Sequence, residues 1–542
     1  MSNQNHRALP VLISVFFFWG FLAASNGIFI PFCKTHFNLS QFQSQLIDSA
    51  FYGAYFIGSL LLYIFSVLFN KDIINLVGYK KTIIYGLLVS IIGALTMIPA
   101  VNSGSFIFIL AAFFIIALGF SLQQTSANPL VLNLGNPATG SYRLNFAGSV
   151  NSLGTAIGPI LVSLVLFGKV IATDADKNSA SLQSINILYV ILAAAFAFAI
   201  IILAVSKIPK LEMEEDGKEV KVLKYPLLFV IGILVFLLVV FSYFTFESRT
   251  DIDSPDSGKF LFLGSISILV VILLAALYFL YKKIKKENKF ETDSYPQVTL
   301  GMIAIFIYVG VEVTIQSNLG SLLKTPEFGG LDNSQIGPYI SLYWGSLMIG
   351  RWTGAIGAFD LKKSTVTVLT LIIPFAALAF VLFMNHVSGA DVTHFYYYAF
   401  CVMILLAGFI LAKQRPAFTL MLFGILGTIS MIVGLMSTGT VGVYAFLSGG
   451  LFCSIMWPCI FSLAIAGLGK YTSQTSGFLI MMILGGAFIP PLQGLLADYS
   501  NIHFSYVIPV ICFIYLAWYA WKMKKLLVNK GINYDDPASS SH

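Results

Sequence analysis

Two carboxylates, Asp48 and Glu312, stand inside long apolar stretches of this 542-residue chain. An ionisable side chain surrounded by apolar groups is costly, so each is a candidate for function by default. Each could take up a proton or form half of a sodium site. A helix-end cap for Asp48 and a hydrogen-bonded structural acid for Glu312 are the simpler interpretations, and both stay open.

Uncharged polar side chains gather in several of the same stretches. Amides both donate and accept hydrogen bonds, as the hydroxyl groups of a neutral polyol require. Tyr308, Glu312 and Gln316 recur at i, i+4 spacing, so a helix would place them on one face. We predict that the residues in contact with such a ligand are Gln123, Gln124, Asn128, Asn151, Tyr308, Gln316 and Asn318.

Aromatic faces cover the apolar side of a sugar ring, and three tryptophans lie in or beside these polar stretches. Trp19, Trp344 and Trp457 are therefore candidate platforms for the ligand. Packing alone, or a position at a membrane interface, is the simpler interpretation of any one of them.

The composition says which solvent these stretches meet. Hydrophobic residues make up 58% of the chain and charged residues only 10%, whereas soluble proteins carry about 25% charged residues. Most of the chain must therefore lie in a lipid bilayer. The chain contains no His-Glu-x-x-His motif, no paired cysteine spacing and no phosphate-binding loop, so we expect no metal, no cofactor and neither an enzyme nor an ATP-driven pump.

A membrane-spanning helix needs about 20 mostly apolar residues, and about 16 segments meet that criterion. They run near 9–32, 42–69, 82–100, 104–133, 142–168, 184–206, 225–246, 259–281, 297–322, 336–357, 364–384, 395–412, 416–436, 441–467, 474–498 and 504–526.

The basic residues orient these spans, because lysine and arginine favour cytoplasmic loops. With the N-terminus in the cytoplasm, 25 of the 31 lysines and arginines fall on the cytoplasmic side. Both termini are then cytoplasmic. Arg143 and Arg351 fall at cytoplasmic ends of spans, where we expect them to anchor or gate. The net charge of +7 is therefore a membrane-surface feature and does not indicate nucleic-acid binding.

The chain contains an internal repeat. The pattern Ser-x-x-x-Gly-x-x-x-Ile-Gly at 49–58 recurs at 341–350, 292 residues later. A proline pair, Pro129 and Pro458, is 329 residues apart, and a Leu-Gly pair with a following proline recurs 331 residues after 153–159. The two halves are therefore related in parallel orientation. The growth of the interval indicates a helix hairpin inserted in the second half.

This repeat defines the predicted domains. Residues 1–206 form a first bundle of six helices, and 207–296 form a cytoplasmic linker with an inserted hairpin. Residues 297–528 form the second bundle, with another hairpin within about 360–436, and 529–542 form a disordered tail. We predict an all-α polytopic membrane protein with two six-helix bundles and two inserted hairpins, the repeat pattern of major facilitator carriers.

The motifs resemble those of the fucose/galactose/glucose:cation symporter family of the major facilitator superfamily. The matching stretches are 46–56, 125–129, 143–145 with 151–154, 308–312, 349–354 and 457–462. The resemblance covers nearly the whole chain apart from the two hairpins. It implies inward sugar transport across a bacterial inner membrane, by alternating access, driven by a co-transported cation. Asn128 and Asn151 match polar positions of the family.

Two departures from the fucose permease pattern bear on the substrate. That pattern has an aspartate after an asparagine late in the first span, where this chain has Gly27 after Asn26. It also has a glutamate where this chain has Gln124. The carboxylates associated with fucose:proton coupling are thus absent. Asp48 and Glu312 are the residues expected to couple transport to a proton or sodium, unless transport is uncoupled.

We therefore expect a carrier for a glucose- or galactose-like hexose, coupled to a cation. The alternatives are an uncoupled facilitator, an exporter of another small polar solute, or a sugar sensor that has lost transport. The expected partners are a sugar and membrane lipid, and the chain is expected to be a monomer.

Overall fold

The computed structural model describes residues 3–37, 41–69, 72–135, 139–168, 183–208, 232, 295–331, 333–359, 361–387, 389–412 and 415–533. Regular structure in these residues is helical, which confirms the predicted fold class. The first half contains α1 (Asn3–His36), α2 (Gln41–Phe69), α3 (Ile73–Val77), α4 (Tyr79–Asn102), α5 (Phe106–Asn133), α6 (Gly140–Phe167) and α8 (Gln183–Val205).

The second half begins with α11 (Pro296–Leu323) and α12 (Asn333–Ala355). It continues with α13 (Lys363–Val387), α14 (Ala399–Ala412), α15 (Pro416–Met436), α16 (Gly439–Cys453), α17 (Met456–Ile465), α18 (Thr472–Met481), α19 (Gly485–Tyr499) and α20 (Val507–Asn529). A break separates α16 from α17, four residues before Pro458, whose missing N–H cannot continue the helical ladder.

Twelve helical segments of the described chain are long and apolar enough to cross a membrane. Helices α2 and α12 are of spanning length as well, at 29 and 23 residues. Every predicted span within the described residues coincides with a helix or a broken helix pair. The predicted spans 225–246 and 259–281, which form the first inserted hairpin, lie outside the described residues except for residue 232.

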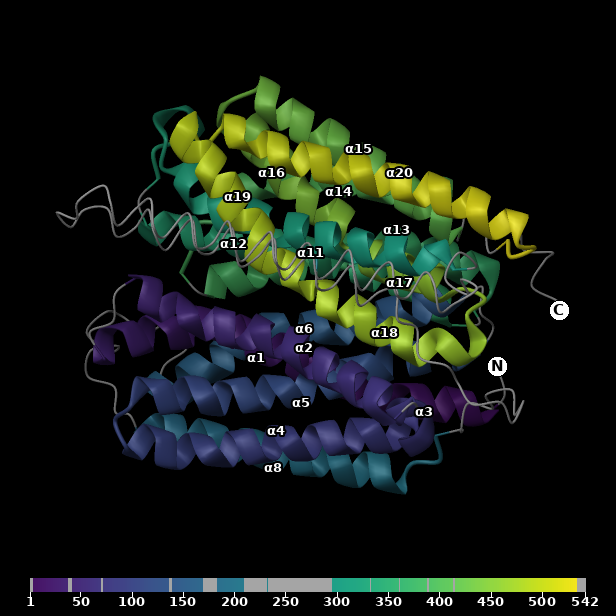
Figure 1. The fold of residues 1–542 in the computed structure, drawn as a ribbon. Helices are drawn as coiled ribbons and strands as arrows, with labels where there is room; N and C mark the ends of the chain where they lie inside the picture. The colour runs from purple at the N-terminus through teal and green to yellow at the C-terminus, as the bar shows by residue number, and fades with distance from the viewer. Residues whose placement is uncertain are drawn as a thin grey trace, which may run out of the picture.

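The helices form two groups that lie along each other (Figure 1). In the first half, α1 packs on α6, and α4 packs on both α5 and α8. In the second half, α11 packs on α19, and α15 packs on both α16 and α20. The two halves therefore repeat one packing scheme.

Close helix contacts occur at equivalent glycines of the two halves. A Cβ on Gly154 of α6 would lie 2.2 Å from the Phe17 carbonyl oxygen of α1. A Cβ on Gly485 of α19 would lie 1.9 Å from the Phe306 carbonyl oxygen of α11. These are the glycines of the repeated Leu-Gly pair, so the sequence repeat corresponds to a repeat of helix contacts.

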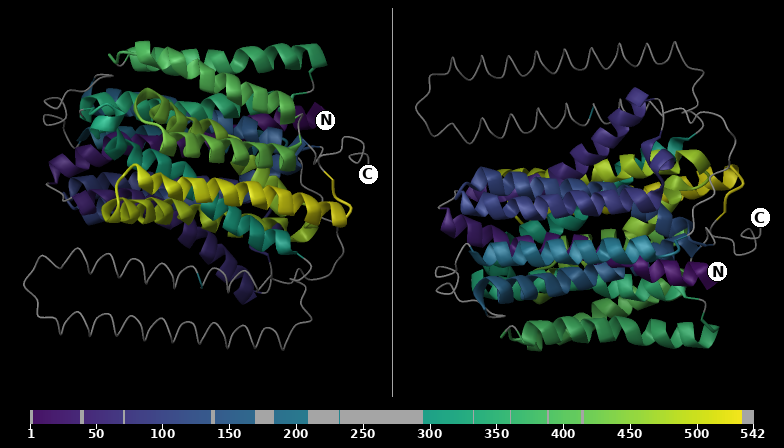
Figure 2. Two further views of the ribbon diagram at one scale, coloured as in Figure 1. Left: turned by 90° about the horizontal axis from the view of Figure 1, so that it is seen from above. Right: turned by 90° about the horizontal axis from the view of Figure 1, so that it is seen from below.

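Helices α13 and α14 lie at the outer edge of the second half (Figure 2). Asn385 of α13 donates to Ser341 Oγ of α12 at 3.0 Å. The Tyr398 hydroxyl, just before α14, lies 2.8 Å from Ser346 Oγ of α12. A Cβ on Gly345 of α12 would meet Val381 of α13 at 2.6 Å. This pair of helices is therefore fastened to α12 by polar and close apolar contacts.

Candidate functional site

The site is built around an ion pair between Glu312 of α11 and Arg351 of α12. Arg351 Nη2 donates to Glu312 Oε1 at 2.9 Å, and the two side chains are only 15% and 12% exposed. The Tyr308 hydroxyl, one helical turn before Glu312, donates to the same oxygen at 3.0 Å. A largely buried charge needs a partner of opposite sign and further hydrogen bonds, and this cluster supplies both.

The position of the Arg351 side chain differs from the one expected from the sequence. We expect it among the basic groups at a cytoplasmic helix end, but its guanidinium lies between helices. Side chains on a helix tilt toward its N-terminus, so a long arginine in the last turns of α12 points back along the helix. The Tyr343 hydroxyl of α12 also donates to the Glu312 carbonyl oxygen, at 2.7 Å.

Arg351 also reaches the other half of the molecule. Its Nη1 donates to Ser152 Oγ of α6 at 3.1 Å and reaches Asn151 Oδ1 at 3.5 Å. Asn151 in turn donates to the Phe16 carbonyl oxygen of α1 at 3.1 Å. The structure thus brings together Asn151, Tyr308, Glu312 and Arg351, which the sequence places in three separate stretches.

The two halves meet along a seam, in which α2, α5 and α6 contact α12, α17 and α18. The Trp352 indole N–H donates to the Ser149 carbonyl oxygen at 3.3 Å, and Ser476 Oγ donates to the Thr125 carbonyl oxygen at 2.7 Å. Farther along, Asn75 donates to the Lys470 carbonyl oxygen at 3.2 Å. The seam therefore runs from the ion pair toward one end of the molecule.

That end is rich in lysine. Lys80 donates to the Ala204 and Ser206 carbonyl oxygens at the end of α8. Lys530, just after α20, donates to Gln297 at the start of α11. We call this end, which also holds Lys470, the basic end. The two halves contact each other at the basic end. The ion pair lies farther along the seam, toward the interior of the molecule.

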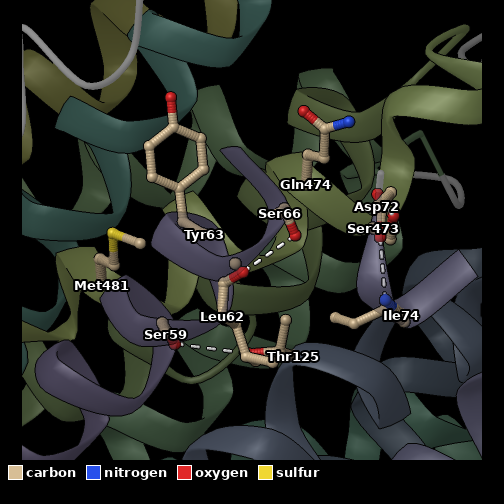
Figure 3. A pocket seen from close by; sticks show the side chains of 11 residues that line it. Ser59, Leu62, Tyr63, Ser66, Asp72, Ile74, Thr125, Ser473, Gln474 and Met481 are labelled. Atoms are coloured by element: carbon tan, nitrogen blue, oxygen red, sulfur yellow. Dashed lines mark hydrogen bonds between the residues drawn. The ribbon is translucent and has the colours of Figure 1, made fainter. Parts of the chain in front are cut away.

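A small pocket in the seam at the basic end is lined by α2, α5 and α18 and contains Asp72 (Figure 3). Asp72 Oδ1 accepts from the backbone N–H groups of Ile74 and Asn75 and so caps α3. Ser473 of α18 donates its hydroxyl to the other carboxylate oxygen. Burial raises the pKa of Asp72 above its ordinary value, and the hydrogen bonds from Ser473 and the backbone oppose that rise.

The sequence prediction did not include Asp72. Asp72 could have been recognised as a helix N-cap, because it is an acidic residue between a long apolar run and a five-residue helix. The sequence gives no sign that α18, some 400 positions later, supplies its partner.

The predicted amide contacts fall into two groups. Gln123 is buried and occupied, since it accepts from the Trp19 indole at 2.9 Å and donates to Ser90 at 3.1 Å. Gln124 donates to the Tyr55 hydroxyl at 3.1 Å. Asn318 donates to the Thr314 carbonyl oxygen of its own helix. In contrast, the amide nitrogen of buried Asn128 has no hydrogen-bond partner among the described residues. Gln316 of α11 is half-buried.

The predicted aromatic platforms also differ in their surroundings. Trp19 is buried within the first half beside Phe16. The Trp457 ring lies 6.2 Å from the Tyr308 ring, next to the ion pair. The half-buried Trp344 packs edge-on against Tyr343. Of the three predicted platforms, Trp457 is therefore the one whose ring lies beside Tyr308.

Arg143 is fully buried at the start of α6. Its guanidinium donates to the carbonyl oxygens of Val131 and Leu132 and to Thr139 Oγ1. A positive charge at the C-terminal end of α5 satisfies carbonyl groups that the helix leaves free. Asp48 lies in α2, but its side chain is outside the described residues.

Comparisons with known proteins agree with this architecture. Residues 11–251 match the family model described as Major Facilitator Superfamily. The chain is 31% identical over 519 residues to the glucose/galactose transporter of Brucella abortus biovar 1, covering 96% of this chain and 94% of that protein. It is 24% identical over 505 residues to the L-fucose-proton symporter of Escherichia coli K12, covering 93% and 90%. The crystal structure of the E. coli fucose:proton symporter is similar at a TM-score of 0.63, with 21% identity over 96% and 99% of the two chains.

Two helical halves of one packing scheme, closed on a charged seam, define an integral membrane transporter rather than an enzyme. More narrowly, the chain belongs to the fucose/galactose/glucose:cation symporter family of the major facilitator superfamily, as its motifs predict.

Proposed function

We propose that this protein carries a glucose- or galactose-like hexose across the bacterial inner membrane by alternating access, together with a proton. The observation that carries the proposal is the cluster of Glu312, Arg351 and Asn151, in which a charge pair of one half meets an amide of the other. A relative named as a glucose/galactose transporter, similar along 96% of the chain, supports the choice of sugar.

The proposed sugar contacts are polar groups of this cluster together with the predicted amides of α5 and α11. Asn151 and Tyr308 belong to it, and the unpaired amide nitrogen of Asn128 offers N–H donors to a sugar hydroxyl. Gln124, Gln316 and Asn318 complete the proposed set, and Trp457 is the proposed platform. Trp19 donates a hydrogen bond to Gln123, so we propose that these two residues stabilise the first half and do not contact the sugar.

The surroundings of Glu312 favour a proton over sodium. The guanidinium of Arg351, 2.9 Å from the carboxylate, repels a metal cation at short range. A proton needs only one carboxylate oxygen and no shell of ligands. Asp48 is the second candidate for coupling. Under this proposal the positive-inside rule puts the basic end, and both termini, in the cytoplasm.

We also propose the domain organisation that the repeat predicts, with bundles at 1–206 and 297–528 and a linker at 207–296. The packing of α15 on α16 and α20, equivalent to that of α4, supports α13 and α14 as the hairpin inserted in the second bundle. The apolar outer faces of that hairpin suit lipid, and we propose that the transporter acts as a monomer.

The test is uptake of labelled sugars into proteoliposomes under an imposed proton or sodium gradient. The sugars are D-glucose, D-galactose, L-fucose, D-mannose and N-acetylglucosamine. We expect a proton gradient to drive accumulation of D-glucose or D-galactose. Glu312→Gln should abolish accumulation and retain exchange, because it removes the proton site but not the sugar contacts.

Glu327→Gln is the matched control, since Glu327 is an exposed carboxylate in the loop after α11. Asp48→Asn tests the second coupling candidate in the same assay. Accumulation by Glu312→Gln at the wild-type level would remove Glu312 from coupling. Failure of every sugar to move under any gradient would refute the proposed function.

A further inference from the structure

The two terminal nitrogens of Arg351 bind different halves of the transporter. Nη2 is held at 2.9 Å by Glu312, on the neighbouring helix of the same half. Nη1 crosses the seam to Ser152 at 3.1 Å and Asn151 at 3.5 Å, both on α6. A guanidinium is planar and its donors form a rigid fork, so it cannot follow one half without leaving the other.

The rest of the contact between α6 and α12 is neutral. Trp352 donates to a backbone carbonyl of α6. Just past α12, the position of Gly357 lies against the Tyr142 ring, and a Cβ there would be only 2.5 Å from it. Such contacts make the two surfaces fit closely but carry no charge. Arg351 is the charged group of this contact in the described residues.

Two of the three side chains that accept from Arg351, Asn151 and Glu312, are also groups that the transport cycle uses, if the proposed function is correct. A sugar hydroxyl that donates to Asn151 Oδ1 competes with Arg351 Nη1 for that oxygen. A proton on Glu312 removes the negative charge that holds Nη2. The other titratable groups facing Glu312 are Tyr308 and Tyr343, and Cys453 of α16 lies nearby. None of these replaces the lost negative charge at neutral pH.

We propose that Arg351 is a two-sided latch on the seam, released only when a sugar occupies Asn151 and a proton occupies Glu312. This inference rests on the proposed function and adds the step that couples its two ligands. With both ligands bound, the closed seam holds a desolvated guanidinium without its counter-charge, which is costly. Opening at the basic end lets water solvate Arg351, and proton loss from Glu312 then restores the pair.

The seam can be observed through spin labels on the two halves at the basic end. Lys81 of α4 and Lys363 of α13 are both exposed and begin helices there. We would label Lys81→Cys and Lys363→Cys in a chain whose five native cysteines are replaced. Distances are then measured without sugar and with D-galactose or D-glucose. Sugar should enlarge the long-distance population of the otherwise wild-type chain.

Arg351→Gln should raise the ratio of open to closed seam roughly tenfold without any sugar, because it removes a charge-assisted cross-seam bond. Arg351→Lys should fall between, since one ammonium cannot span both acceptors. A sugar-free distance distribution of Arg351→Gln equal to that of wild type would overturn the latch. This comparison needs no transport substrate, so its result is independent of which solute the protein carries.

Ser152→Ala tests the same cross-seam bond in case the arginine variants fail to fold. It removes a single hydroxyl from the seam. Its matched control is Thr155→Val, one turn further along α6, where the hydroxyl bonds only within its own helix. We expect opening in Ser152→Ala but not in Thr155→Val. Equal distance distributions in these two variants would count against the latch. If wild type ignores both sugars while Arg351→Gln opens, the latch stands and the proposed sugar is wrong.

Discussion

Arg143 and Arg351 are both largely removed from water, but their hydrogen-bond partners differ in kind. Arg143 donates to backbone carbonyls at the end of α5, which cannot leave without unwinding the helix. Arg351 donates to side chains on two other helices, each of which can accept a different partner. At the scale of the residue, the bonds of Arg143 hold a helix end in place, whereas Arg351 can exchange its partners.

This difference predicts that Arg143 acts on stability. In Arg143→Lys a single nitrogen replaces the three that reach two carbonyls and a hydroxyl, so at least one buried acceptor loses its donor. We expect a loss of about 1–3 kcal/mol in the free energy of unfolding, measured by thermal unfolding in detergent. Arg415→Lys, at an exposed arginine before α15, is the control. An equal loss in both variants would show that the buried contacts contribute little.

The candidate site could be predicted only in part at this scale. Glu312 was recognisable because a carboxylate in an apolar span stands out against its neighbours. Its partner was not, because the direction of the Arg351 side chain depends on how α12 lies against α11 and α6. Gln123 looked like a ligand contact for the same reason that Glu312 did. Nothing in the sequence indicates that Trp19, on another helix, occupies its amide oxygen.

At the scale of the element, glycines decide how near two helices come. Gly58 of α2 and Gly350 of α12 hold equivalent places in the repeat. A Cβ at either would lie within 3 Å of a serine, Ser121 of α5 or Ser454 beyond α16. The same glycine-to-serine contact therefore occurs once in each half. Small residues at such crossings let backbones approach closely in a membrane, where lipid gives helices no hydrophobic reason to associate.

Gly154→Ala tests this dependence. The added methyl group would meet the Phe17 carbonyl oxygen at 2.2 Å, so α1 and α6 must separate. We expect a loss of roughly 1–3 kcal/mol in the free energy of unfolding, as for an overpacked core. Gly53→Ala in α2 is the control, because a Cβ there meets nothing within 4 Å, and helix propensity should then favour alanine by about 0.5–1 kcal/mol. Opposite signs in the two thermal shifts are the expected result.

Elements were the most predictable level of this molecule. Length and apolarity mark a span because lipid offers no partner for a free backbone group. The break between α16 and α17 follows from Pro458, which the sequence displays. Which helices touch is a different matter, since α1 packs on α6 and not on its chain neighbour alone. The sequence repeat predicts only that each helix pairing of the first half has an equivalent in the second.

At the scale of the whole molecule, the closed seam brings together groups that alternating access must separate. Asp72 belongs to the loop after α2, and its partner Ser473 belongs to α18. Closure desolvates Asp72 and raises its pKa, and Tyr79 of α4 is a titratable neighbour of this carboxyl. Opening returns water to the carboxyl and brings the pKa back toward its ordinary value.

Closure should therefore depend on pH. A carboxyl whose pKa is higher in the closed state binds its proton more tightly there, so acid favours closure. Protonation of Asp72 therefore stabilises the closed state fully at a pH below its ordinary pKa. This stabilisation is lost as the pH rises through the raised pKa of the closed state. In the Glu312→Gln background, the spin-label distance should lengthen with rising pH, whereas Asp72→Asn should make it independent of pH. Asp391→Asn, at an exposed carboxylate far from the seam, should leave the dependence intact.

Helix α12 carries the latch arginine together with Ser341 and Ser346, and it is absent from the twelve segments apolar enough to cross a membrane alone. Asn385 and Tyr398, which satisfy those two serines, belong to chain that follows it. During synthesis α12 therefore reaches the membrane before these two partners have emerged. Its stable integration must wait until the next two helices have emerged. The helix that closes the transporter thus depends, for its place in the bilayer, on a hairpin that takes no part in the seam.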